Sequence, residues 1–169
     1  MGSTLLDAVR GLVGARVTDV GRTADMVEVG FDVAGAEHRL HVQCAFRLVR
    51  GAQILLGTTD LGYAENRSDT RAAAFENRTT MFDRNARRLT DRFAVTGYEV
   101  VLAEVSEIGA VVIEASDAMR FEVVPTGAGP AECWRLFERG SDVHHVYPES
   151  ADHDEPPDCS DDGPWPSLD

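Results

Sequence analysis

The segment His38-Arg39-Leu40-His41-Val42-Gln43-Cys44-Ala45-Phe46-Arg47-Leu48 alternates polar and apolar residues from Arg39 onward. Because successive side chains of a β-strand point to opposite faces, this pattern predicts one continuous, half-buried strand over residues 38–48. The apolar face of this strand carries Leu40, Val42, Cys44, Phe46 and Leu48. The polar face carries His41, Gln43 and Arg47, spaced about 7 Å and then about 13 Å apart. This polar row suits an anion or a carboxylate, and the alternative is an ordinary solvated strand face.

A weak internal repeat surrounds this strand. Each half begins with an amphipathic helix, over 3–13 and 80–94, and each helix is followed by a glycine and three strands. We expect the strands over 15–20, 25–33 and 38–48 in the first half, and over 98–105, 110–116 and 119–124 in the second. The repeat predicts an α+β fold of two similar α-β-β-β halves. These halves would form antiparallel sheet with the helices packed on one face, related by a pseudo-twofold axis.

Composition divides the chain into one globular domain, 1–147, and an acidic tail, 148–169. Within the domain, the halves 3–60 and 80–147 are joined by the polar segment 61–79, which we expect to be a mobile connection or a surface loop. Prolines and like charges oppose a packed element in the tail, so we expect it to be disordered. Trp165 makes the tail either a docking point for a partner or an inert solubilising segment.

The net charge of −13 is concentrated in the tail. Residues 149–169 contain eight acidic residues and no arginine, which leaves about −5 on the rest of the chain. Such a charge disfavours nucleic acid and suits a basic protein partner. No apolar run approaches the roughly 20 residues of a membrane span, and we expect neither membrane insertion nor a signal peptide. Three widely spaced cysteines fit reduced thiols, so the predicted location is cytoplasmic.

A second motif, Glu132-Cys133-Trp134-Arg135-Leu136, shares an aromatic-Arg-Leu triplet with Phe46-Arg47-Leu48. The match makes Arg47 and Arg135 candidate equivalents, so Glu132 could pair with either arginine. The motif has two interpretations, a structural ion-pair network against the tryptophan or part of a ligand site. The candidate ligand-binding residues are His41, Gln43, Arg47, Glu132, Trp134 and Arg135.

The sequence predicts neither a metal site nor a cofactor. The four candidate ligands His38, His41, His144 and His145 are adjacent or three apart, so within strands their side chains diverge. No nucleophile elbow, phosphate-binding loop, dinucleotide fingerprint or zinc-protease motif is present. The chain contains no lysine, which excludes Schiff-base chemistry. We predict no catalytic residue, and enzymatic activity is the less favoured interpretation.

The first motif, Leu40 to Leu48, together with Glu132-Cys133-Trp134-Arg135-Leu136, resembles a family of small bacterial proteins known as a domain of unknown function. The resemblance covers about residues 12–146 and not the tail. It implies no activity, but it supports treating His41, Gln43, Arg47, Glu132, Trp134 and Arg135 as one constellation.

These observations favour a non-enzymatic protein that binds a protein partner, as an accessory or immunity-type factor. The alternative is a small-molecule or anion-binding protein, or an enzyme, with its site between the two halves around His41, Gln43 and Arg47. A third hypothesis is a homodimer formed through the free face of the sheet.

Overall fold

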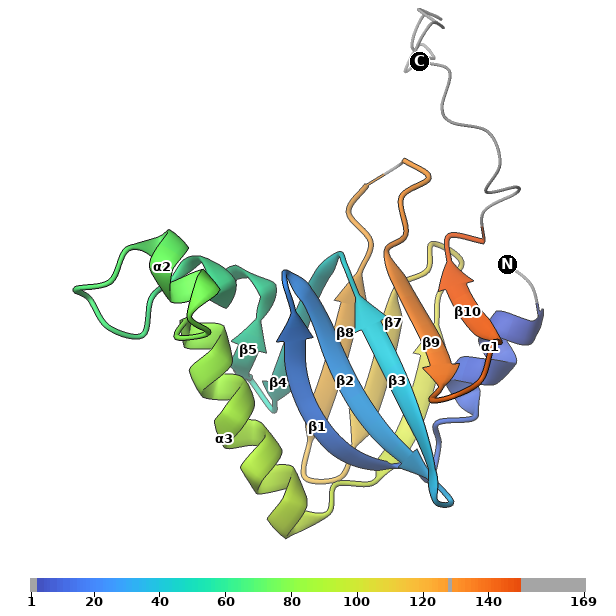
Figure 1. The fold of residues 1–169 in the computed structure, drawn as a ribbon. Coiled ribbons are helices and arrows are strands. Elements are labelled where there is room, and N and C mark those ends of the chain that lie inside the picture. The colour runs from blue at the N-terminus through green and yellow to red at the C-terminus, as the bar shows by residue number, and fades with distance from the viewer. Residues whose placement is uncertain (1–2, 128, 150–169) are drawn as a thin grey trace, which may run out of the picture.

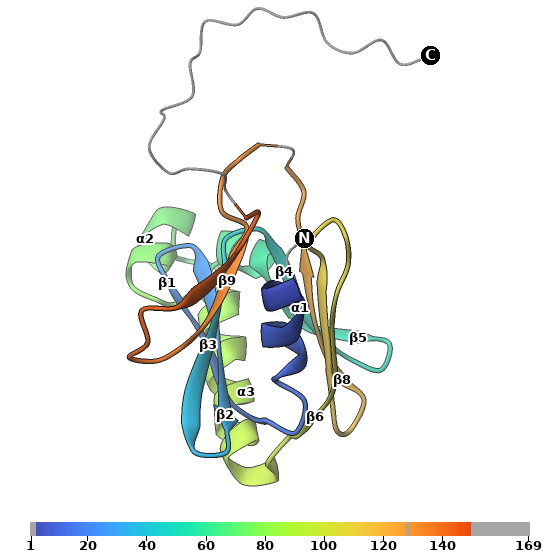
Figure 2. The same ribbon diagram turned by 90° about the vertical axis from the view of Figure 1, so that its right-hand side faces the viewer.

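The computed structural model describes residues 3–127 and 129–149, which form two facing antiparallel sheets of five strands each (Figures 1 and 2). Sheet A has the strand order β1-β2-β3-β9-β10: Arg16–Thr23, Met26–Val33, Ala36–Val42, Trp134–Glu138 and His144–Tyr147. Sheet B has the order β5-β4-β8-β7-β6: Gln53–Gly57, Ala45–Arg50, Met119–Val124, Val111–Ala115 and Val100–Val105. The predicted α+β class with antiparallel sheet is confirmed.

Each sheet combines three consecutive strands from one part of the chain with a pair of strands from another part. Sheet A joins three consecutive strands from the first part of the chain, β1 to β3, to the pair β9 and β10 from its end. Sheet B joins three consecutive strands from the second part, β6 to β8, to the pair β4 and β5. Each predicted half therefore contributes strands to both sheets. The pseudo-twofold relation between the halves stays a prediction.

The two main helices lie along the open sides between the sheets. Helix α3, Met81–Thr96, packs on the edge strands β1 and β5. Helix α1, Ser3–Arg10, packs on the opposite edges, β6 and β10. Figure 2 looks between the sheets, with α1 in front and α3 behind it. This position differs from the expected one over a single sheet face. Since both sheets turn an apolar face inward, the helices instead seal the gap between them.

The predicted strand over 38–48 is wrong in one respect, because it is two strands in different sheets. Strand β3 ends at Val42 and β4 begins at Ala45, so the chain turns a corner at Gln43 and Cys44. The apolar alternation continues through the corner, and the flanking side chains at positions 40, 42, 46 and 48 are all buried. Side-chain alternation reports which way a residue faces. It does not report which sheet the backbone joins, so the corner between β3 and β4 could not be predicted from the alternation.

Aromatic side chains from both sheets and from α3 meet in the core. Phe31 of sheet A meets Phe121 of sheet B edge to face, with ring centroids 6.1 Å apart. Phe93 of α3 lies 6.4 Å from Phe121 and 5.5 Å from Tyr98. All four are at most 1 % exposed. Burial of each such side chain stabilises the fold by roughly 1.5–3 kcal/mol, which holds both sheets and the helix together.

The start of α3 follows the sequence prediction. Thr80 and Asp83 form a reciprocal capping box, and Gly97 ends the helix with a left-handed φ of 67°. The segment 61–79 is more structured than expected. It contains the end of the short helix η1, Thr58–Gly62, and all of α2, Arg71–Glu76. In the described part of the chain, no helix is both long and apolar enough to cross a lipid bilayer.

Candidate functional site

Four of the six predicted site residues come together on the outer face of sheet A. His41 of β3 stands directly beside Arg135 of β9 in the strand register. Two nitrogens of the Arg135 guanidinium, Nε and Nη2, each donate a hydrogen bond of 2.6 Å to the carboxylate of Glu132. The same carboxylate accepts a hydrogen bond from Nε2 of Gln43 at 3.1 Å. The prediction that Glu132 pairs with an arginine of a triplet is confirmed, and the arginine is Arg135.

An aromatic row continues the cluster toward the edge of the sheet. The ring of Phe137 meets the His41 imidazole edge to face, with centroids 4.8 Å apart. On its other side, Phe137 stacks on His144 at 4.4 Å. Partial burial lowers the pKa of His41, and Arg135 lowers it further, whereas the carboxylate of Glu28 at 4.0 Å opposes them. The net pKa of His41 lies below its usual value, so this imidazole is neutral near pH 7.

A charge network crosses the same face beside the aromatic row. Asp19 of β1 accepts a hydrogen bond from Arg39 of β3 at 2.5 Å, and Arg39 also pairs with Glu37. Glu37 in turn binds Arg139 at 2.9 Å. The contact from β1 to β3 passes over Gly30 of β2, where any Cβ atom would collide with the Asp19 side chain. Glycine at this position is therefore what lets a side chain reach across an entire strand.

The outer face of sheet A is thus a continuous polar and aromatic surface. We use this name for the residues Asp19, Glu28, Glu37, Arg39, His41, Gln43, Glu132, Arg135, Phe137, Arg139 and His144. Figure 1 views sheet A from this side, and no described helix crosses in front of it. The prediction missed Arg39 and Phe137. Their signal was present, because each continues the alternation of a residue already selected, His41 and Arg135.

The other two predicted residues lie elsewhere. Arg47 is on β4 in sheet B, where it pairs with Glu122, which also binds Arg120 at 2.6 Å. Trp134 is fully buried, and its indole Nε1 donates to the carbonyl oxygen of Gly109 at 2.7 Å. Hence Trp134 belongs to the core, and Arg47 faces away on a different sheet with a different partner. A site that uses Arg47 together with His41 and Gln43 is not assembled in this structure.

The two described cysteines meet at the corner between the sheets. The backbone N–H of Gln43 donates to the carbonyl oxygen of Cys133 at 2.8 Å, which brings Cys44 next to the second motif. Burial raises the pKa of the Cys44 thiol to about 12, and the neighbouring Cys133 thiol contributes to the same effect. A thiol with this pKa is protonated at neutral pH, and Cys44 packs partly buried against the core.

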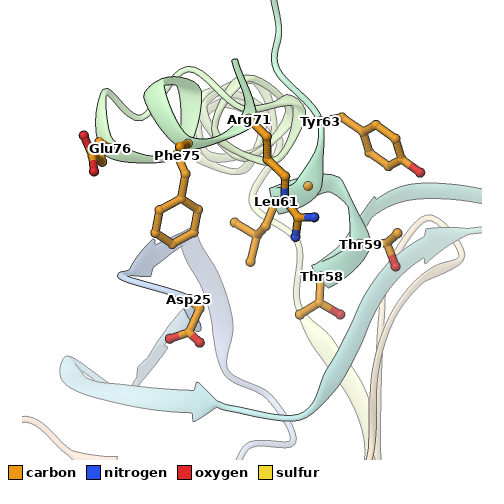
Figure 3. Close-up of a pocket in the computed structure, with 10 residues that line it drawn as sticks. Asp25, Thr58, Thr59, Leu61, Tyr63, Arg71, Phe75 and Glu76 are labelled. Atoms are coloured by element: carbon orange, nitrogen blue, oxygen red, sulfur yellow. The ribbon is translucent and has the colours of Figure 1, made fainter. Parts of the chain in front are cut away.

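A separate pocket of about 770 Å³ opens between η1, α2 and the turn that joins β1 to β2 (Figure 3). Its walls include the apolar side chains of Leu61 and Phe75, the hydroxyl groups of Thr58 and Thr59, and the guanidinium of Arg71. Sequence reasoning missed it, because the segment that forms most of it was interpreted as a loop. Only a three-dimensional arrangement brings Asp25, in the β1–β2 turn, to the same pocket.

Within residues 3–127 and 129–149, potential metal ligands are dispersed and buried polar side chains are hydrogen-bonded. No three potential metal ligands of the His, Cys, Asp or Glu type gather in this part of the chain. Every buried side-chain nitrogen and oxygen described has a hydrogen-bond partner. The described surfaces offer paired charges, aromatic edges and a hollow.

Comparison of the chain with protein-family models, with curated proteins and with solved structures gives no match. The resemblance to a bacterial family of unknown function stays a prediction.

Proposed function

We propose that this chain is a non-enzymatic binding protein that engages a protein partner through the outer face of sheet A, as an accessory or immunity-type factor would. The observation that carries the proposal is the row His41–Phe137–His144 on a sheet face that no described helix covers. Aromatic side chains on a sheet face that is open to solvent are typical anchors of protein interfaces.

The charges of this face support a protein partner over a small ligand. Its arginines already pair with acids of the same face, as Arg135 does with Glu132 and Arg39 with Asp19. These pairs hold the side chains in fixed positions, which lowers the entropy cost of docking a complementary surface. A small anion would have to compete with a carboxylate that is already in place.

The acids of the face outnumber its arginines, which favours a basic partner. The carboxylates are Asp19, Glu28, Glu37 and Glu132, and the guanidiniums are Arg39, Arg135 and Arg139. The net charge of −13 for the whole chain acts in the same direction at longer range. Association with a basic partner should weaken as salt rises.

A pull-down from the extract of the native host, with full-length variants as bait, tests the proposal. Phe137→Ala removes the central ring, and Glu28→Arg reverses one charge of the face. Glu104→Arg is the matched control, because it makes the same charge change on an exposed position of β6 in the other sheet. A partner retained by wild type and by Glu104→Arg, but lost from both face variants, supports the interface.

The same experiment can refute the proposal. If the face variants keep their melting temperatures and still retain every protein that wild type retains, the outer face of sheet A is not the interface. A complex of two copies of this chain, seen as a doubled mass by light scattering, would identify the homodimer instead.

A further inference from the structure

The pocket between η1, α2 and the β1–β2 turn has the size of a small-molecule site. Its volume of about 770 Å³ falls within the roughly 300–1,000 Å³ that such sites occupy. Leu61 and Phe75 give the hollow its apolar lining, and Figure 3 shows their side chains next to each other. None of its lining residues belongs to the outer face of sheet A, so it is a distinct surface.

A single buried arginine fixes the walls of this pocket. The guanidinium of Arg22 donates to the carbonyl oxygen of Ala24 at 2.7 Å and to that of Phe75 at 2.6 Å. It also binds Asp83 at the start of α3 through two hydrogen bonds, at 2.8 and 3.0 Å. The turn that carries Asp25 and the helix that carries Phe75 are therefore tied to the same group. The pocket is formed before any ligand arrives.

Charges of both signs line the pocket. Arg71, Asp25 and Glu76 all line this hollow, and all three are exposed to solvent, so their charged groups are available to a ligand. In Figure 3 the guanidinium of Arg71 lies beside Leu61 and above Thr58, and Asp25 lies across the pocket below Phe75. The hollow itself keeps the opposite charges apart.

We propose that this pocket binds a small zwitterion with an apolar body, of the class of hydrophobic dipeptides. The ligand's carboxylate binds Arg71, its apolar side chains lie against Leu61 and Phe75, and its ammonium group faces Asp25. Such a ligand neutralises charges of both signs and covers the apolar walls in one binding event. A simple anion would contact the guanidinium of Arg71 alone, and a simple cation would contact the carboxylate of Asp25 alone, so neither would use both charges of the pocket.

The probe is leucyl-leucine, titrated into the full-length protein and followed by ¹⁵N NMR shifts of the amides around the pocket. Two derivatives of leucyl-leucine serve as comparison probes. The C-terminal amide lacks the carboxylate, and the N-acetyl derivative lacks the ammonium group. We expect saturable binding of leucyl-leucine and at least about tenfold weaker binding of each derivative, because each loses a hydrogen bond to a charged group.

Variants assign the ends of the ligand. Arg71→Ala should weaken leucyl-leucine by at least about tenfold but leave the affinity for the C-terminal amide unchanged, since that probe has no carboxylate to lose. Asp25→Asn should likewise weaken leucyl-leucine but leave the affinity for the N-acetyl derivative unchanged, since that probe has no ammonium group to lose. Arg67→Ala is the matched control, because this exposed arginine precedes α2 and does not line the pocket.

Two outcomes overturn the inference. One is the absence of saturable shifts with all three probes at millimolar concentration. The other is an equal affinity of the Arg71→Ala and Arg67→Ala variants for leucyl-leucine. Melting temperatures show that each variant is folded. The inference does not rest on the protein partner of sheet A, so either result leaves that proposal standing.

Discussion

Replacement of Arg22 by methionine should destabilise the fold more than any other single loss of charge in the described chain. The Arg22 side chain is 3 % exposed and its partner Asp83 is 8 % exposed, so water cannot take over the lost contacts. Methionine approximates the volume of the arginine stem, which keeps the cost of a cavity small. The variant therefore isolates the charge and its four hydrogen bonds, two to Asp83 and one each to the carbonyls of Ala24 and Phe75.

The magnitude follows from what Arg22→Met leaves behind. Asp83 stays buried with only Thr80 as a donor, through the backbone N–H at 3.1 Å and the hydroxyl at 2.7 Å. Removal of one partner from a buried ion pair costs about 3–5 kcal/mol, since an uncompensated charge remains. Total stabilities of single domains are about 5–15 kcal/mol, so the loss takes up a large fraction. Arg47→Met should cost less than about 1 kcal/mol, because Arg47 is 52 % exposed in its pair with Glu122.

The assay is urea unfolding followed by the fluorescence of the buried Trp134, in a Trp165→Phe background that removes the second tryptophan. A double-mutant cycle of Arg22→Met with Asp83→Asn should give a coupling energy of about 2 kcal/mol or more. A loss of less than about 1 kcal/mol for Arg22→Met, or additivity of the cycle within about 0.5 kcal/mol, would refute the reasoning.

Four further outcomes follow from local geometry and from the shifted pKa values of Cys44 and Asp83. Gly30→Ala should cost up to about 1 kcal/mol in the same urea assay, because its Cβ displaces the Asp19 side chain from its partly exposed pair with Arg39, whereas Gly21→Ala on β1 meets open space and should cost less; equal losses would contradict this. Iodoacetamide at pH 8 should label Cys44 far more slowly in the folded than in the unfolded protein, as measured by mass spectrometry, because the pKa is raised from 9 to about 12. Above pH 9 only the unfolded chain gains that thiolate, so stability should fall as pH rises toward 12. Burial alone would raise the pKa of Asp83, but hydrogen bonds from its arginine and threonine partners outweigh it and the net pKa is lowered. That contribution to stability is present above the ordinary value of 3.8 and is lost as pH falls through the folded pKa, so Asp83→Asn should flatten the acid limb of the urea profile; an unchanged limb would show that the pair is not responsible.

The fold class could be predicted from the sequence, but the arrangement of the strands in two sheets could not. Amphipathic periods and the capping box at Thr80 are local signals, and they identified α3 and most strands correctly. The division into two sheets depends on which strands share hydrogen bonds, which is a tertiary property. The corner at Gln43 and Cys44 shows the limit, because the inward and outward alternation is the same on both sides of it.

The candidate site was predictable to the extent that its residues share a strand or a motif. His41 and Gln43 belong to one strand end, and Glu132 lies three residues from Arg135, so sequence proximity reflects spatial proximity. Trp134 was selected for its place in the motif, but strand alternation turns it inward, away from Arg135. Arg47 was lost to the site because it lies beyond the corner, on the strand that joins the other sheet.

The pocket could not be predicted, and the reason lies in the Arg22 network. Its charged rim comes from Arg71 and Glu76 of α2 and from Asp25, which precedes them by 46 and 51 residues in the sequence and shares no pattern with them. They meet because Arg22 draws the β1–β2 turn and α2 onto the start of α3. One group thus supports both the stability of the fold and the shape of the pocket. Both the turn with Asp25 and the helix with Arg71 lose this anchor, so variants of Arg22 that remain folded should lose discrimination against the N-acetyl probe and against the C-terminal amide together.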